Sequence, residues 1–106
     1  MTTKIIGTGS YLPEHVVSND DLAKLVDTSD EWIRERTGIQ SRHLAKQETV
    51  SFMAAKAAEE ALADSGLKAE EIDLILVATS SSETVFPNTS CEVQKAIGAV
   101  HAWGYD

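Results

Sequence analysis

Apolar residues at helical spacing predict the clearest helix in the chain. They recur at the i, i+3, i+4, i+7 positions of one helical face: Val50, Met53, Ala54, Ala57, Ala58, Ala61 and Leu62. Lys56 and Glu60 stand four residues apart on the polar side, a spacing that favours an ion pair, and Gly66 supplies a stop. Because most of the apolar face is alanine, we expect it to approach a sheet or another helix closely.

Three other stretches have the pattern of strands. Residues 72–78 form a nearly unbroken apolar run, which is typical of a strand covered on both faces, so we expect it to lie centrally in a parallel sheet. Residues 4–9 resemble a short strand that enters a glycine-rich bend, and Pro13 prevents a regular continuation. Residues 99–106 have the pattern of a further strand.

Capping residues and glycine stops predict two short helices in the first half of the chain. Ser18 or Asn19 caps a helix over residues 20–26. A second helix opens at Ser29, with acidic residues in its first turn, and ends at Gly38.

A third short helix is expected near the end of the chain. Thr89 or Ser90 caps it, Gly98 stops it, and Cys91 lies on its apolar side. Helices and strands therefore alternate along one domain of residues 1–106, which predicts an α/β fold with a mostly parallel sheet.

Composition excludes several classes of protein. Seventeen acidic residues against nine basic ones give a net charge of -8, which argues against a nucleic-acid binder. No stretch approaches the ~18 apolar residues that a membrane span needs, and a single cysteine rules out an intrachain disulfide. We expect a cytoplasmic protein.

One group of basic residues departs from the acidic average. Four of the nine basic residues and a histidine lie within a short segment: Arg34, Arg36, Arg42, His43 and Lys46. Such a cluster is either a solvated surface or a site for an anionic ligand.

No catalytic or metal centre can be assigned from residue spacing. Gly7 and Gly9 follow a predicted strand, but the third glycine of a dinucleotide fingerprint is absent, so a tight turn is the simpler interpretation. The three histidines lie far apart along the chain, and no Cys/His cluster has metal-site spacing. Cys91 is best interpreted as a small buried hydrophobe and not as a nucleophile.

The segment 28–38 is the most informative. Trp32 and Arg36 are four residues apart and share a helical face, with Thr28 one step further back. An indole offers a stacking surface for a base, and a guanidinium offers paired donors to a phosphate, so the pair suits a nucleotide-like ligand. The alternative is that Trp32 packs in the core and Arg36 pairs with a surface carboxylate.

The same segment carries a family resemblance. The Asp-Glu-Trp-Ile run at residues 30–33 and the Arg-Thr-Gly-Ile run at residues 36–39 resemble the β-ketoacyl-acyl-carrier-protein synthase III family of the thiolase-like superfamily. Residues 3–13, the Phe-Pro pair at 86–87 and the run at 91–94 fit the same pattern, so the resemblance covers all 106 residues in order.

The resemblance implies binding roles for five residues. In the family, the tryptophan of this motif stacks on the adenine of coenzyme A, and the neighbouring arginine and threonine contact the same ligand. These roles fall on Trp32, Arg36 and Thr37, with Thr28 as a polar contact to the base. Phe86 would lie at the dimer interface, near the partner's acyl pocket, against the alternative of a plain core position.

The resemblance also implies a fold and an activity. The implied fold is part of the first α/β half of a thiolase-like enzyme, with a mostly parallel central sheet. The implied activity is condensation of acyl-CoA, usually acetyl-CoA, with malonyl-acyl-carrier-protein to initiate fatty-acid synthesis. Family members carry their catalytic cysteine, histidine and asparagine after the position of Asp106. We therefore assign no catalytic residue and no metal, and we expect the chain alone to be inactive.

Coenzyme A would serve as a substrate carrier and not as a resident cofactor, and the complete protein would be a homodimer. The nearest alternative is a related condensing enzyme of secondary metabolism that loads another starter group. A non-catalytic CoA-binding or dimerisation fragment is a second alternative, and an acidic interaction domain without a ligand is a third.

Overall fold

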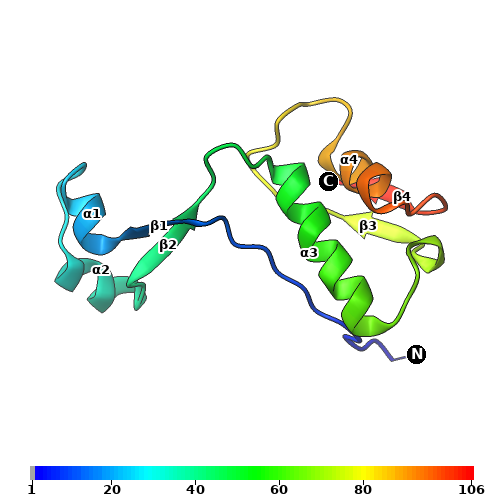
Figure 1. Cartoon of the computed structure of the whole chain (residues 1–106), viewed down its shortest axis with the longest axis horizontal. Helices are drawn as coiled ribbons and strands as arrows, with labels where there is room; N and C mark the ends of the chain where they lie inside the picture. The colour runs from blue at the N-terminus through cyan, green and yellow to red at the C-terminus, as the bar shows by residue number, and fades with distance from the viewer. Residues whose placement is uncertain (1) are drawn as a thin grey trace. The chain divides into compact units, whose positions relative to one another are not determined.

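The structure, a computed structural model, describes residues 2–106 and divides into two compact units (Figure 1). One unit is Leu12–Gln47. The other combines the residues up to Tyr11 with Glu48–Asp106. Each unit has its own elements and its own contacts, and each is described separately below.

The unit Leu12–Gln47 pairs two strands and two helices. Strands β1 (His15–Ser18) and β2 (Ser41–Leu44) form an antiparallel pair, and helices α1 (Asn19–Ala23) and α2 (Asp30–Thr37) lie between them in sequence. Neither strand was predicted, because each has only four residues and a mixture of polar and apolar side chains. This pair also departs from the parallel arrangement that the sequence indicated.

Both helices of this unit begin at capping residues that the sequence indicated, and α2 also ends at its predicted glycine. The Ser18 hydroxyl accepts a hydrogen bond from the Asp21 N–H (3.1 Å), and the Asp21 carboxylate returns one from the Ser18 N–H (3.0 Å), which forms a capping box. The Ser29 hydroxyl caps α2 by accepting from the Trp32 N–H (3.2 Å), and Gly38 ends α2 at φ 73°. Only the end of α1 differs, since it stops three residues earlier than predicted.

A buried asparagine ties this unit together. The Asn19 side chain is 1% exposed, and its amide donates to Asp30 Oδ1 (2.8 Å) and to the Ile39 carbonyl (2.7 Å). Its oxygen accepts from Arg42 (2.7 Å), which also donates to the Val17 carbonyl (3.1 Å). Because both amide donors and the oxygen are used, burial leaves none of these groups unpaired.

The second unit is the α/β part of the chain. It contains α3 (Val50–Ser65), a 3-10 turn η1 (Ala69–Glu71), β3 (Leu74–Leu76), α4 (Thr89–Ile97) and β4 (Trp103–Tyr105). Strands β3 and β4 pair in parallel, α3 packs against α4, and α4 packs against β4. The long predicted helix is confirmed with its glycine stop, and two of the three strands predicted for this unit, at 72–78 and 99–106, are present but shorter.

The prediction that the apolar run at 72–78 is covered on both faces is wrong for this chain. In residues 2–106, β3 has β4 as its one partner strand. Alternate strand residues face opposite sides, so Leu74 (52% exposed) and Leu76 (68% exposed) point away while Ile75 is half-buried. The core of this unit is small and centres on Val93 of α4 and the alanine at 99.

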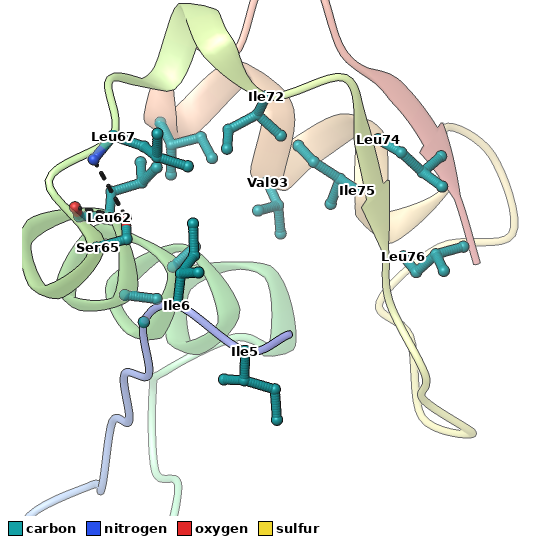
Figure 2. Close-up of a pocket in the computed structure, with 14 residues that line it drawn as sticks. Ile5, Ile6, Leu62, Ser65, Leu67, Ile72, Leu74, Ile75, Leu76 and Val93 are labelled. Carbon is teal, nitrogen blue, oxygen red and sulfur yellow. Dashed lines mark hydrogen bonds between the residues drawn. The ribbon is translucent and has the colours of Figure 1, made fainter. Parts of the chain in front are cut away.

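Residues 4–9 do not form the predicted strand. They run as extended chain along α3, where the Thr8 N–H donates to Asp64 Oδ2 (2.9 Å) and the Ser10 N–H donates to Glu60 Oε2 (3.2 Å). An open apolar groove of about 350 Å³ is lined by Ile5 and Ile6 on one side and by β3 on the other (Figure 2). The N-terminal segment therefore pairs with none of the described strands, and two of its backbone N–H groups donate to carboxylates of α3 instead.

Gly7 and Gly9 are required by close packing and not by a tight turn. Neither has a positive φ. A Cβ on Gly7 would stand 2.7 Å from the Ala61 carbonyl oxygen and from Ser65 Cβ, and a Cβ on Gly9 would collide with the Ala57 carbonyl oxygen. The turn interpretation is thus wrong. The alanine face of α3 was predicted to approach a sheet or another helix closely, and at Ala57 and Ala61 it is an extended segment that comes this near.

Two local details of the helices also differ from prediction. Lys56 Nζ forms an ion pair with Glu59 (3.5 Å), three residues along α3, and not with Glu60 as predicted. The Glu60 carboxylate instead accepts a hydrogen bond from the Ser10 N–H of the N-terminal segment. The cap position of α4 is Asn88, and not Thr89 or Ser90 as predicted, and the Asn88 side chain makes no capping bond.

Candidate functional site

A polar hollow lies at the start of α2. It has a volume of about 320 Å³ and is lined by Asp27, Thr28, Ser29 and Trp32. The Ser29 cap fixes the first turn of α2, so the Trp32 side chain leaves the helix beside the hollow. The indole is 54% exposed, which offers an aromatic surface next to polar groups.

Arg36 follows Trp32 by one helical turn and covers part of it. Its Cζ lies 5.4 Å from the centroid of the Trp32 ring, within the range of a cation–π contact. The alternative of a core tryptophan and a carboxylate-paired arginine is wrong: the indole is more than half exposed, and no ion pair between described residues involves Arg36.

The other two arginines of the basic group already have side-chain partners within the unit Leu12–Gln47. Arg34 Nε pairs with Asp30 Oδ1 at 2.9 Å, and Arg42 donates to the buried Asn19. The hydrogen bond from Arg34, followed by that from Asn19, holds the pKa of the Asp30 carboxyl below its ordinary value. Arg36 is thus the arginine of this group whose charge is best placed to meet an anionic ligand.

The two threonines stand in different surroundings. Thr28 is half-buried and lines the hollow. The Thr37 hydroxyl donates to the Ile33 carbonyl (2.8 Å) and accepts from the Ile39 N–H (3.0 Å). A hydroxyl carries one proton and two lone pairs, so Thr37 retains one lone pair and no donor for a ligand.

Phe86 belongs to the other unit and is almost fully accessible. Its side chain is 89% exposed, and the neighbouring Val85 is 98% exposed. The core alternative for Phe86 is therefore wrong. Two adjacent exposed apolar side chains on one loop are typical of a contact surface.

No catalytic or metal cluster is apparent in the described part of the chain. Within residues 2–106, no group of three or more His, Cys, Asp and Glu residues is placed to hold a metal ion. His43 Nδ1 lies 2.6 Å from the Pro13 carbonyl oxygen, and Cys91 is a half-buried free thiol against Gly104 of β4. Across the same residues, no helix is long and apolar enough to cross a membrane.

Sequence reasoning missed two polar residues with structural roles. Asn19 was considered only as a cap, and Asp106, whose carboxylate accepts two backbone hydrogen bonds at the start of α4, was not singled out. No local pattern could have revealed either, because their partners lie between 11 and 23 residues away along the chain.

Known proteins resemble the chain over its whole length. No family model matches the sequence. Two curated relatives are both β-ketoacyl-[acyl-carrier-protein] synthase III proteins. The Granulibacter bethesdensis protein is 57% identical over 103 residues, 96% of this chain, and the Aquifex aeolicus protein is 53% identical over 106 residues, 100% of this chain. The chain spans about a third of their lengths, 32% and 34% respectively.

Solved structures agree with the sequence comparison. The crystal structure of the synthase III from Aquifex aeolicus matches with a TM-score of 0.92 and 52% identity, over 99% of this chain and 34% of that one. A priming β-ketosynthase from the R1128 polyketide pathway matches with a TM-score of 0.90 and 38% identity, over 97% of this chain and 31% of that one. In sequence and in its thiolase-like α/β fold, the chain therefore corresponds to the N-terminal third of the β-ketoacyl-acyl-carrier-protein synthase III enzymes.

Proposed function

We propose that the polypeptide carrying this chain is an acyltransferase that condenses an acyl-CoA, with acetyl-CoA as the first choice, with malonyl-acyl-carrier-protein to initiate fatty-acid synthesis. The similarity to synthase III proteins along the whole chain supports the reaction class. The observation that carries the ligand assignment is the exposed Trp32 indole beside a polar hollow, with the Arg36 guanidinium 5.4 Å from the ring centroid.

In this proposal the chain binds the nucleotide end of coenzyme A. Arg36 covers one face of the indole, and the adenine stacks on the other face, beside the hollow. Thr28 lines that hollow and offers a polar contact to the base, while the guanidinium of Arg36 attracts a phosphate. Thr37 contributes at most one acceptor, since its proton already goes to the Ile33 carbonyl.

The chemical step needs groups that this part of the polypeptide is not expected to supply. A condensing enzyme requires an activated thiolate to take up the acyl group and donors to stabilise the developing enolate. Cys91 is a half-buried free thiol within α4, where it suits a small apolar residue of the helix, so we assign it no catalytic role. We expect residues 1–106 alone to show no condensation.

The proposal includes assembly and location. We infer a homodimer in which Phe86, exposed on its loop, contacts the second copy near the acyl pocket. The expected location is the cytoplasm, and acyl carrier protein is the second substrate partner.

A related starter enzyme of secondary metabolism is the second candidate, favoured by the 38% identity to a priming β-ketosynthase of a polyketide pathway. The two candidates share the CoA site and differ in the acyl group. Turnover of the complete polypeptide with acetyl-CoA and with longer acyl-CoAs separates them. Binding of CoA without turnover of any acyl-CoA would instead support a non-catalytic CoA-binding protein.

The test of the CoA site compares two tryptophans in the complete polypeptide. Trp32→Ala removes the stacking surface, so the KM for acyl-CoA and the dissociation constant for adenosine 3′,5′-bisphosphate should rise about 5- to 150-fold, equivalent to ~1–3 kcal/mol of base stacking. Trp103→Ala is the matched control, because Trp103 is also exposed (80%) but lies on β4. Arg36→Ala should remove a contribution that weakens as salt rises. Unchanged constants in Trp32→Ala and Arg36→Ala would refute the assignment.

A further inference from the structure

Helix α2 carries the proposed nucleotide site on one face and polar attachments on the opposite face. Trp32 and Arg36 stand four residues apart, and Asp30 and Arg34 stand four residues apart in the same way. The two pairs are offset by two residues, which is about 200° around the helix axis. The side chains proposed to meet the ligand therefore leave α2 on the side away from Asp30.

One buried side chain bonds to both ends of α2. At the first residue of the helix, Asp30 Oδ1 accepts from the Asn19 amide at 2.8 Å. Just past the Gly38 stop, the Ile39 carbonyl accepts from the same amide at 2.7 Å. The Asn19 N–H adds a hydrogen bond to the Gln40 carbonyl at 3.1 Å. Asn19 begins α1, which lies beside α2 (Figure 1), and from there it fixes both the entry and the exit of α2.

The orientation of the Asn19 amide is itself fixed. Its oxygen accepts from Arg42 Nη2 at 2.7 Å, and Arg42 Nη1 donates to the Val17 carbonyl at 3.1 Å. A guanidinium only donates, so the Asn19 oxygen must face Arg42 of β2 and its nitrogen must face α2. The side chain is 1% exposed, so water does not compete for these bonds. A buried network in which every group is paired is rigid, and this one links β2 to both ends of α2.

The two ends that Asn19 holds lie close to the proposed ligand residues. Trp32 is two residues after Asp30, and its N–H bonds to the Ser29 cap. At the other end, the Ile39 N–H donates to Thr37 Oγ1 at 3.0 Å. An eight-residue helix is too short to be stable by itself, so the place of α2 depends on such attachments. A shift of either end would move the indole or the Thr37 hydroxyl.

We propose that Asn19 is a positioning residue of the coenzyme A site. By bonding to Asp30 and to the Ile39 carbonyl, it holds α2 so that the Trp32 indole and the Arg36 guanidinium meet the adenine nucleotide in one geometry. A site that is held in place before the ligand arrives loses less conformational freedom on binding. The ligand rests on the proposed function, whereas the support of α2 rests on the hydrogen bonds of Asn19 alone.

The test is Asn19→Asp in the complete polypeptide. This change keeps the size of the side chain and an acceptor for Arg42, but it removes both donors to α2 and places a carboxylate against Asp30 and the Ile39 carbonyl. The dissociation constant for adenosine 3′,5′-bisphosphate and the KM for acyl-CoA should rise about fivefold to tenfold, the fold-change that corresponds to one net hydrogen bond. The kcat at saturating acyl-CoA should stay at the wild-type value, because the change acts on binding of the nucleotide end.

Two controls separate positioning from a loss of stability. Ser18→Ala removes the cap of α1 in the same unit. Gln94→Ala removes two amide-to-carbonyl hydrogen bonds, to Ala99 and Ala102, in the other unit. Both should lower the free energy of unfolding and leave the dissociation constant and the KM unchanged. A partly unfolded enzyme has fewer active molecules, which lowers the apparent kcat without raising the KM.

A milder variant covers the case in which Asn19→Asp does not fold. Asp30 is partly exposed, and Asp30→Ala frees only the first end of α2 from Asn19. The dissociation constant for adenosine 3′,5′-bisphosphate should rise about twofold to fivefold in that variant, again with kcat unchanged. Wild-type affinity in Asp30→Ala would count against the positioning role.

The remaining outcomes are distinct for the two proposals. Unchanged constants in Asn19→Asp, or a loss of kcat alone, overturn the positioning role, while the proposed function stands if Trp32→Ala still weakens binding. An equal rise in Asn19→Asp, Ser18→Ala and Gln94→Ala shows general destabilisation and also overturns the role. If the wild-type polypeptide binds neither the bisphosphate nor acyl-CoA, the proposed function fails and the positioning role fails with it.

Discussion

Replacing Gly9 with alanine should destabilise the α/β unit more than alanine at any other glycine of the chain. The new methyl group would collide with the Ala57 carbonyl oxygen and stand 2.5 Å from the Ala61 N. Both are backbone atoms inside α3, so no change of rotamer can make room. The N-terminal segment must lift away from the helix, or α3 must bend.

The expected magnitude follows from the contacts at stake. Overpacking a close-packed site costs about 1–3 kcal/mol. Lifting the segment also strains the hydrogen bonds from Thr8 to Asp64 and from Ser10 to Glu60, which are exposed and therefore contribute ~1 kcal/mol each at most. We expect a loss of about 3 kcal/mol in the free energy of unfolding, measured by urea denaturation of the complete polypeptide.

Two glycines provide the comparison. A Cβ on Gly38 meets nothing within 4 Å, but φ there is 73°, so Gly38→Ala should cost about 1 kcal/mol through backbone strain alone. A Cβ on Gly104 meets side-chain and backbone atoms of α4 at 3.0–3.3 Å and should fall between the two. A loss for Gly9→Ala no larger than that for Gly38→Ala would show that the N-terminal segment does not pack on α3 as the structure has it.

Two further predictions concern the unit Leu12–Gln47. Asn19→Ala should lower the stability of this unit by about 3 kcal/mol, because three part-buried hydrogen bonds are lost, including the one from Arg42. Amide exchange within α1 and β2 should rise together, and unchanged exchange would contradict this. Asp30 has a folded-state pKa below its ordinary value, caused first by Arg34 and then by Asn19, so its contribution is present above the unfolded-state pKa and is lost as the pH falls through the folded-state pKa. Asp30→Asn should therefore flatten the acid limb of a stability–pH curve, and an unchanged limb would refute the role of this carboxylate.

The sequence alone determined where the helices lie, most of their boundaries and the family resemblance. Ser18, Ser29, Gly38, Gly66 and Gly98 mark helix boundaries because capping and left-handed stops are local interactions, decided within a few residues. The motifs around Trp32 likewise occupy one helix, so their shared face could be deduced from spacing. The comparisons then confirmed the resemblance that those motifs indicated.

Only the tertiary structure decided what the strands and the isolated polar residues do. A strand's partner can lie anywhere in the chain, so an apolar run at 72–78 cannot specify whether one or two neighbours cover it. Gly9 suits a turn as well as a close contact until α3 is placed against it. Asp106 became the cap of α4 because β4 carries it there from sixteen residues beyond Ser90, a distance at which local sequence patterns hold no information.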